Sequence, residues 1–320
     1  MIPALVLTAG LATRLRPLSL VRAKAAMPVA GEPIVRRILR QLRSAGVTDA
    51  VLNLHHLPQT IAGVVGDGSD LGIRVRYSWE MPVLGSAGGP RQALPLLDTK
   101  AFLIVNGDTL STVDLRALAS EHQSRGGLVT MAVVPNARPE AYGGVLVDDQ
   151  GAVTGFVRRG STVKSYHFTG IQVAEADAFA SLIPGTPAES VVALYPSLIA
   201  GRPGSVRASI SNADFVDIGT PADYLRTSLL ISTREQGVGR YGMRTHVDPT
   251  ARVEDSLLWD DVTIEAGSVL RECIVADGAR VPAGTSWAGV TLRPAESELA
   301  PGERRVGELA VAALDVNARP

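Results

Sequence analysis

The sequence is poor in cysteine and has no excess of charge of either sign. Cys273 is the one cysteine in 320 residues, which excludes an intramolecular disulfide framework and a zinc site built on several thiolates. The 31 basic and 32 acidic residues leave a formal net charge of -1, so the chain lacks the basic excess that draws proteins to nucleic acid or anionic membranes. We therefore expect neither nucleic acid nor a membrane as a partner, and any anion site must be local.

Long apolar segments are also missing. No stretch approaches the roughly 18 uninterrupted apolar residues of a membrane-spanning helix, and the apolar start lacks the basic segment and cleavage pattern of a signal peptide. Together with the single thiol, these absences predict a cytoplasmic protein. What is present, 46% hydrophobic and 20% charged residues, suits a globular protein, and 320 residues leave room for two domains.

Strand-like and helix-like patterns alternate over most of the chain. Short apolar or alternating runs predict strands at 4–7, 49–53, 73–79, 101–106, 128–134, 144–147, 153–157, 166–173 and 215–218. Helical spacing and caps predict helices at 33–45, 58–65, 114–123, 176–182, 188–200 and 221–234. This order predicts a doubly wound α/β fold, Rossmann-like, with a mixed and mainly parallel sheet that binds ligands at the carboxyl ends of its strands.

The pattern changes near residue 235. A glycine-rich segment ends the helical periodicity. Beyond it apolar residues recur six apart, first at Val247 and Val253 and then at Val269, Val275, Val281 and Trp287. This period is typical of a β-helix with short flat faces, and an irregular β-rich tail is the alternative. We predict a catalytic domain over 1–235 and a β-helix-like domain over 236–320. A few coils expose an apolar end, so we expect the tail to serve self-association or regulation.

A basic loop follows the first predicted strand. It begins with the run from Thr8 to Leu18 and continues to Lys24, and its spacing fits neither the dinucleotide fingerprint nor the P-loop. Arginine grips phosphate oxygens in pairs and lysine acts as a movable point charge, so a triphosphate could use both. The loop's position at a strand end favours this over a merely solvated loop. The candidate phosphate ligands are Arg14, Arg16, Arg22 and Lys24.

Two carboxylates stand at strand ends. Asp108 closes Asn106-Gly107-Asp108 after the most apolar strand, and Asp217 interrupts another apolar run. A carboxylate at such a place either caps a turn or binds a hard cation such as Mg²⁺, which takes one or two carboxylates plus substrate phosphates. Because a charge in an apolar strand is costly unless it is paired or metal-bound, Asp217 is the candidate partner of Asp108.

These segments resemble the signatures of sugar-1-phosphate nucleotidyltransferases. Leu7 to Leu18, with Lys24 and Met27-Pro28-Val29, is similar to the family's L-A-A-G-x-G-T-R-L-x-P-L-T followed by P-K and P-V. Asn106-Gly107-Asp108 and the run from Asp217 to Tyr224 look like its two metal-site motifs, and Leu84 to Gly89 like its base-recognition loop. The tail is similar to the left-handed β-helix of mannose-1-phosphate guanylyltransferases.

The resemblance implies an enzyme that joins a nucleoside triphosphate to a sugar 1-phosphate and releases pyrophosphate, with GTP and mannose 1-phosphate favoured. It implies that the catalytic residues are Arg14, Lys24, Asp108 and Asp217, with Mg²⁺ held by the two aspartates. The nucleotide would contact Leu7, Ala9, Gly10, Ala12, Thr13, Arg14, Gly85, Ala87 and Gly88. The sugar phosphate would contact Gly143, Arg159, Thr169 and Gly170. A phosphate monoester with a second pKa near ~6 is largely a dianion at neutral pH, so no histidine base is expected.

Three positions depart from the family pattern. Ala12 replaces the second loop glycine, and if that site needs a positive φ, alanine costs roughly 1 to 2 kcal/mol. Ala23 replaces the proline before Lys24. Arg158 stands where the family has a glutamate that accepts sugar hydroxyls, which leaves the sugar open.

Other functions fit the sequence less well. A uridylyltransferase acting on another sugar 1-phosphate and a catalytically silent, nucleotide-sugar-binding regulatory homologue stay open as alternatives. A dinucleotide-dependent oxidoreductase would need the glycine fingerprint and an acidic residue near Asn53. A metal-dependent glycosyltransferase would need two carboxylates in a D-x-D pattern, whereas Asn106-Gly107-Asp108 supplies one.

Overall fold

The structure is a computed structural model in which residues 1–237, 239–296 and 298–314 are described. The chain divides into two compact units. The first comprises Met1–Gly10 and Val35–Val216, and the second comprises Leu11–Ile34 and the chain from Asp217 on. From Leu11 on, the basic loop therefore belongs with the C-terminal part and not with the sheet that precedes it. The predicted domain boundary after residue 235 stays a prediction.

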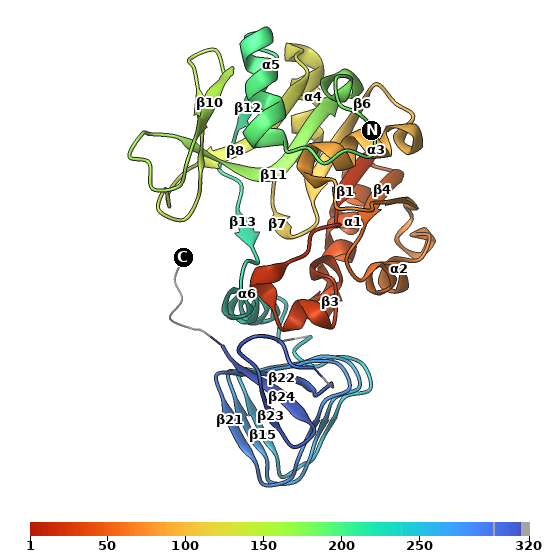
Figure 1. The fold of residues 1–320 in the computed structure, drawn as a ribbon, viewed down its shortest axis with the longest axis vertical. Helices are drawn as coiled ribbons and strands as arrows, with labels where there is room; N and C mark the ends of the chain where they lie inside the picture. Colours follow the sequence, from red (N-terminus) through yellow and green to blue (C-terminus); the bar gives the residue numbers. More distant parts are fainter. Residues whose placement is uncertain (238, 297, 315–320) are drawn as a thin grey trace. The chain divides into compact units, whose positions relative to one another are not determined.

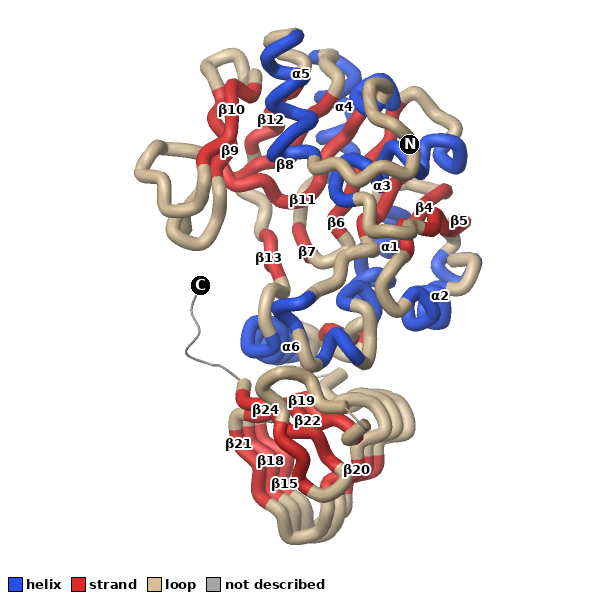
Figure 2. Tube along the Cα trace, in the orientation of Figure 1, coloured by secondary structure: helices blue, strands red, loops and turns tan. Residues whose placement is uncertain are grey.

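A mixed sheet forms the centre of the first unit. Its strands are β1 (Ala4–Leu7), β4 (Asp49–Leu54), β5 (Arg74–Trp79), β6 (Ala101–Asn106), β8 (Val129–Pro135), β9 (Gly144–Val147), β10 (Val153–Val157), β11 (Tyr166–Glu175) and β12 (Val206–Ile210). Within the described residues the order is β10-β9-β11-β6-β1-β4-β5, and β8 joins β11 to β12 (Figure 2). β6, β1, β4 and β5 are parallel, whereas β11 runs antiparallel to β6 and β8. The predicted doubly wound mixed sheet is confirmed, although β12 was missed.

The helices of the sheet region follow the sequence pattern with exceptions. They are α1 (Ile34–Ser44), α2 (Pro58–Val65), α3 (Gly85–Leu97), α4 (Leu115–Arg125) and α5 (Tyr195–Gly201). Asp114 caps α4 by accepting hydrogen bonds from the N–H groups of Arg116 and Ala117. The helix predicted at 176–182 is only a 3₁₀ turn, η5 (Ala176–Phe179). The helix predicted at 188–200 is a π-helical turn, η6 (Ser190–Leu194), that leads into α5.

Helix α3 was not predicted, because its glycines and its two internal prolines, Pro90 and Pro95, are breaker signals. It packs against β1, β4 and β5 and buries Ala87, Ala93 and Leu97. This burial outweighs the local preference against a helix. The segment expected to be a base-recognition loop is therefore the start of a helix.

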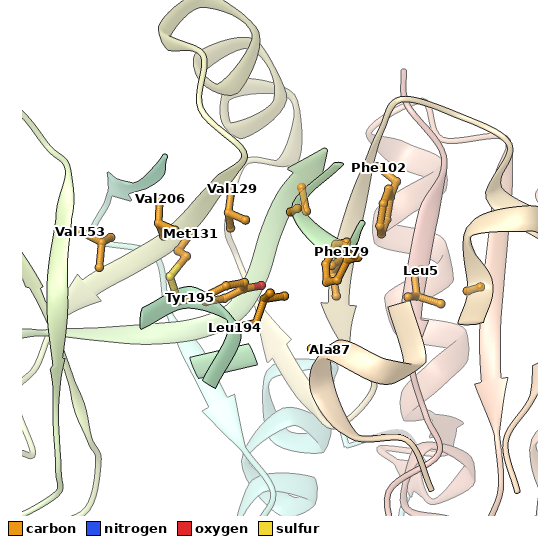
Figure 3. Close-up of a cluster of buried hydrophobic side chains, with 14 of the residues drawn as sticks. Leu5, Ala87, Phe102, Val129, Met131, Val153, Phe179, Leu194, Tyr195 and Val206 are labelled. Atoms are coloured by element: carbon orange, nitrogen blue, oxygen red, sulfur yellow. The ribbon is translucent and has the colours of Figure 1, made fainter. Parts of the chain in front are cut away.

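One apolar cluster fills the space between α3, α5 and the sheet (Figure 3). Leu5, Phe102 and Val129 project from the sheet toward Ala87 of α3 and Tyr195 of α5. Because side chains alternate along a strand, Ala4 and Val6, which are fully buried, face the other side of the sheet. The sheet is thus covered on both faces. No helix in the described part of the chain is long and apolar enough to cross a membrane.

The second unit begins with the basic loop and α6. The loop forms 3₁₀ turns and a short hairpin: η1 (Thr13–Leu15), η2 (Leu18–Leu20), η3 (Lys24–Ala26), β2 (Pro28–Val29) and β3 (Glu32–Pro33). Helix α6 (Pro221–Arg234) packs against β2. Pro221 opens the helix, as predicted, and Thr220 caps it by accepting a hydrogen bond of 3.1 Å from the N–H of Asp223.

A three-sided parallel coil follows, drawn in blue tones in Figure 1. Its strands are β14 (His246–Val247), β15 (Arg252–Glu254), β16 (Leu257–Leu258), β17 (Thr263–Ile264), β18 (Val269–Arg271), β19 (Ile274–Val275), β20 (Arg280–Val281), β21 (Ser286–Ala288) and β22 (Val290–Pro294). Val253 pairs with Leu270, and Leu270 pairs with Trp287, so equivalent residues stand 17 positions apart. The β-helix-like fold predicted for the tail is confirmed.

The coil corrects the six-residue pattern at one position. Its core residues Ile264, Leu270 and Val275 show spacings of six and then five, which gives a 17-residue turn in place of three equal sides. Leu270 is the buried residue of β18, whereas Val269, assigned from the sequence, is only half-buried. A single shorter side is enough to shift the inward position by one residue.

An antiparallel hairpin ends the described chain. Strands β23 (Arg304–Val306) and β24 (Leu309–Ala313) add to the edge of β22, and Leu309 and Val311 join the core of the coil. Arg293 donates two hydrogen bonds of 2.7 Å to Glu303, and both side chains are almost fully buried. The chain itself therefore supplies part of the cover for the coil core.

Candidate active site

A chain of buried polar groups joins the end of β1 to the start of α3. The N–H of Thr8 donates to Asn53 Oδ1 at 2.6 Å, and the Thr8 hydroxyl donates to the carbonyl of Asn53. Asn53 Nδ2 donates to Glu80 Oε1 at 2.7 Å, and Glu80 Oε2 accepts the N–H of Leu84 at 2.8 Å. Because unpaired buried polar groups are costly, this network fixes both segments together. Glu80 was not predicted from the sequence, although its position directly after a strand, as a carboxylate, was the available signal.

The predicted base-recognition residues Gly85, Ala87 and Gly88 lie in the first turn of α3. Packing explains why glycine is needed at position 88, since a Cβ there would come within 2.6 Å of the Thr186 carbonyl. The N–H groups of Ala87 and Gly88 both donate to the carbonyl of Ala188, at 2.9 and 3.1 Å. The chain near residue 188 therefore packs against this turn, and contact with a nucleobase stays a prediction.

Asp108 follows a close contact between the ends of two paired strands, β1 and β6. Leu7 pairs with Asn106, and the N–H of Gly107 donates to the Leu7 carbonyl at 2.9 Å. A Cβ at Gly107 would lie 2.6 Å from that oxygen, so only glycine fits. The half-buried Asp108 accepts a hydrogen bond of 3.2 Å from the Thr109 hydroxyl. Asp108 thus stands at the carboxyl edge of the sheet, beside the end of β1.

The segment after Asp108 runs beside the segment that leads to Asp217. Strand β7 (Thr109–Ser111) pairs with β13 (Phe215–Asp217). The carbonyl of Asp214 accepts hydrogen bonds of 2.9 Å from the N–H of Thr112 and from the hydroxyl of Ser111. These contacts lie within the first unit, and Asp217 is the residue at which the second unit resumes.

Three of the four predicted catalytic residues gather in the second unit. Lys24 Nζ lies 3.5 Å from Asp217 Oδ1, with side chains that are 11% and 29% exposed. The guanidinium of Arg14 lies over Gly219, where a Cβ would be 3.1 Å from its Nη1 atom. Asp223 Oδ2 is 3.6 Å from the same position. Arg14 and Lys24 therefore approach one turn, at residues 217–219, that also carries a carboxylate.

The remaining predicted nucleotide contacts lie along the start of the basic loop. Leu7 ends β1, Ala9 is buried, and Gly10 and Thr13 are exposed. Ala12 has a φ of 47°, so the position where the family carries glycine does adopt the left-handed conformation. The strain expected for alanine at this site is therefore present.

The predicted sugar-phosphate residues occupy a bulge and two loop ends. The pairing of β11 with β8 shifts register between Phe168 and Gln172, which creates a bulge at Thr169 and Gly170. A Cβ at Gly170 would come within 2.7 Å of Asn106 Nδ2, so the bulge lies against the end of β6. Thr169 is buried, and its hydroxyl donates to the Ala132 carbonyl at 3.0 Å. Gly143 precedes β9, and Arg159 is exposed beyond β10.

An aromatic cluster, missed from the sequence, borders this region. His167 stacks on Phe215 with a centroid distance of 4.5 Å and lies 4.3 Å from the ring of Tyr142. Burial lowers the pKa of His167 to about 4, against an opposing hydrogen bond to the backbone of Gly143. His167 is therefore neutral at physiological pH.

The acidic residues suit a hard divalent cation. In the part of the chain that the structure describes, no cluster of three or more His, Cys, Asp or Glu side chains could hold a metal ion. Asp108 and Asp217 each offer carboxylate oxygens, the ligand type that hard divalent cations prefer, and their binding of a metal ion stays a prediction.

The sheet and its strand-end residues define an α/β nucleotide-binding enzyme. The sequence profile described as nucleotidyl transferase matches residues 3–234, and the chain belongs to this family. It is 27% identical over 302 residues to the mannose-1-phosphate guanylyltransferase of Mycobacterium tuberculosis, covering 84% of this chain and 83% of that one. It is also 27% identical over 301 residues to the UTP–glucose-1-phosphate uridylyltransferase of Synechocystis, covering 87% and 76%.

A solved structure agrees with the fold. HddC from Yersinia pseudotuberculosis matches with a TM-score of 0.63 at 22% identity, covering 72% of this chain and all of that one. At this identity the match establishes the shared fold of the sheet region.

Proposed function

We propose that this protein transfers a guanylyl group from GTP to mannose 1-phosphate and releases pyrophosphate. The observation that carries the proposal is the approach of Arg14 and Lys24 to the turn that bears Asp217, within a chain of the nucleotidyl transferase family. Similarity to the Mycobacterium tuberculosis enzyme over most of both chains favours this pair of substrates.

The proposed chemistry needs charge neutralisation and alignment more than a base. An oxygen of the sugar phosphate, already a dianion, attacks the α-phosphorus of the triphosphate. The bond from this phosphorus to the bridging oxygen breaks, and pyrophosphate leaves with the electron pair. Arg14 would bind the triphosphate oxygens as a planar fork, and Lys24 would add a point charge. Holding two anions in line in this way lowers the barrier.

We propose that Asp108 and Asp217 bind Mg²⁺. The hydrogen bonds of Asp214 with Ser111 and Thr112 support this pairing, because they hold the chain before Asp217 beside the chain after Asp108. When bound, the ion would offset negative charge on both substrates. Lys24 already faces the Asp217 carboxylate, so it would share that charge.

The nucleobase and sugar contacts are proposed in the same way. The first turn of α3, with Gly85, Ala87 and Gly88, would lie against the base, and Leu7, Ala9, Gly10, Ala12 and Thr13 would follow the phosphates. Gly143, Thr169, Gly170 and Arg159 would border the sugar phosphate. Support comes from the bulge at Thr169 and Gly170, which contacts the strand end that leads to Asp108.

We also propose that the protein acts in the cytoplasm and self-associates through its coil. The single buried cysteine suits a reducing compartment. Sedimentation velocity of the full chain tests the association, and a monomer at micromolar concentration would contradict it.

A second candidate is uridylyl transfer to another sugar 1-phosphate, which similarity to the Synechocystis enzyme favours. Pyrophosphate release over a matrix of GTP, UTP, dTTP, ATP and CTP against mannose and glucose 1-phosphates separates the two. GTP with mannose 1-phosphate should give the highest kcat/KM. A preference for UTP would support the second candidate, and binding without turnover would indicate a regulatory homologue.

Arg14→Ala tests the proposed mechanism directly. Loss of the Arg14 guanidinium should lower kcat on the order of 100-fold, because this group stabilises negative charge that develops in the transition state. Arg234→Ala, which removes an exposed arginine from the end of α6, is the matched control and should leave kcat unchanged. If Arg14→Ala raises only KM, the residue contributes uniform binding instead.

A further inference from the structure

Arg22 lies in the basic loop, yet its charge is directed at the coil. Its Nε and Nη2 atoms donate to Asp277 at 2.6 and 2.7 Å, and Nη2 also donates to Asp260 at 2.6 Å. The side chain is only 12% exposed, and its guanidinium lies 5.3 Å from the ring centroid of Trp259. Arg22 therefore acts differently from the phosphate ligand that the sequence suggested.

The charge balance explains why this contact is strong. Burial disfavours the charged form of Arg22, but hydrogen bonds and attraction from Asp277 and Asp260 outweigh it and raise the pKa of Arg22. The N–H of Asp260 also donates to Asp277 Oδ1 at 3.0 Å, so the two carboxylates are neighbours. Without Arg22 they would be two adjacent, partly buried negative charges.

The same segment of the loop is held at its other end. The hydroxyl of Tyr224 in α6 donates to the carbonyl of Pro28, and Trp259 of the coil donates to that hydroxyl at 2.9 Å. Farther along, a Cβ at Gly239 would come within 2.1 Å of the Ala30 carbonyl, so the chain beyond α6 contacts the tip of the β2–β3 hairpin. Residues 22–31 are thus anchored at three places, all within the second unit.

Lys24 lies between these anchors. It opens η3, a single 3₁₀ turn, and such short turns have little stability of their own. The direction of its side chain, which lies 3.5 Å from Asp217, therefore depends on what holds the turn at each end. The nearer anchor is Arg22, two residues earlier.

We propose that Arg22 is a positioning residue of the nucleotidyl transfer, through which Asp260 and Asp277 of the coil hold Lys24 in place for the triphosphate. The inference rests on the proposed function and deepens it. The coil would then influence the rate of nucleotidyl transfer through one arginine of the basic loop, without contacting either substrate.

The test compares Arg22→Met with a matched variant, Arg244→Met. Arg244 makes an equally close two-point contact with Asp261 on the same coil, at 2.6 and 2.7 Å, but it is exposed. Arg22→Met should lower kcat/KM for the triphosphate on the order of 10- to 100-fold, because a displaced group loses its alignment. Arg244→Met should match the wild type. Asp277→Asn is a milder change and replaces Arg22→Met in the test if that variant does not fold. It should lower kcat/KM for the triphosphate by a smaller factor.

A double-mutant cycle separates positioning from general stability. In a Lys24→Met background, adding Arg22→Met should weaken triphosphate binding by less than twofold further. The reason is that both substitutions would remove the same contribution, that of a correctly placed Lys24. If the two losses multiply, Arg22 acts independently of Lys24 and the positioning role is wrong.

Hydrogen exchange reads the loop without turnover. Amides in the 3₁₀ turns at residues 20–27 should exchange at least about tenfold faster in Arg22→Met than in Arg244→Met, since an anchor of the loop is lost. Unchanged exchange with unchanged kcat/KM would overturn the inference and leave the proposed function intact. A wild type that turns over no substrate pair would overturn the proposed function, and triphosphate affinity and exchange would still decide the role of Arg22.

Discussion

The sheet region and the coil are built on opposite principles. In the sheet, single residues that occur once decide the geometry: Asn53 and Glu80 join two segments, and Gly107 allows a close contact with the end of β1 that no other residue fits. In the coil, each position is repeated 17 residues later and supported by its copies, as Val253, Leu270 and Trp287 are. We therefore expect substitutions in the irregular sheet region to affect catalysis, and substitutions in the repetitive coil to affect mainly the stability of the fold.

This contrast predicts that one substitution in each region should separate activity from stability. Asp108→Ala should lower metal-dependent turnover by at least about 1,000-fold, because a charge that neutralises both reactants is lost. The melting temperature should change little, since Asp108 is only half-buried. Steady-state kinetics across a magnesium titration and calorimetry measure the two effects.

Asp149→Ala is the control for this prediction, because it removes an exposed carboxylate from a turn of the same unit. It should retain wild-type turnover. Full activity of Asp108→Ala would remove this residue from the proposed metal site.

In the coil the expected effects are reversed. Leu270→Ala removes a fully buried side chain from the middle of the ladder and should cost about 3 kcal/mol of unfolding free energy. Well below the unfolding transition, kcat should stay within about twofold of the wild type, since Leu270 has no part in the chemistry. Denaturant unfolding and kinetics at low temperature check both. Val269→Ala, next to it and half-buried, should cost clearly less; an equal cost would contradict the assigned inward position.

The polar network of the sheet should combine both kinds of effect. Asn53→Ala leaves the N–H of Thr8 and the carboxylate of Glu80 buried without their partner, at a cost of about 2 kcal/mol. Because the network holds the start of α3, KM for the triphosphate should rise more than kcat falls. Thr48→Ala, at an exposed strand end, is the control. A loss of stability with unchanged KM would limit the network to a structural role.

The sequence predicted those elements whose pattern is local. Strands such as 101–106 and helices such as 221–234 carry apolar spacing and caps that tertiary contacts reinforce, so prediction and structure agree. Helix α3 was missed because Pro90 and Pro95 disfavour a helix. Only the packing of this segment on β1 and β4 outweighs that preference. Local propensity cannot reveal such a reversal.

The candidate site was predicted only as far as its motifs extend. Arg14, Lys24 and Asp217 were assigned from a resemblance, and their approach around Gly219 agrees with a common role. Arg22, grouped with them by charge, pairs instead with Asp260 and Asp277, more than 230 residues away in the chain. No spacing rule connects residues so far apart, which is why contacts of this kind become visible only in the folded chain.

The smallest expected effect concerns the boundary between regular and irregular backbone. Ala12 adopts a φ of 47° with no side-chain cap, so Ala12→Gly should stabilise the fold by about 1 kcal/mol, because glycine adopts this conformation without strain. Gly160→Ala is the reverse control: Gly160 has a φ of 85° and open space around it, so alanine there should cost a similar amount. Chemical denaturation of both variants measures the difference. Ala12→Gly could leave the free energy of unfolding unchanged while Gly160→Ala lowers it. In that case the backbone of the basic loop adjusts to relieve the strain at Ala12, and the loop deforms more easily than the sheet that precedes it.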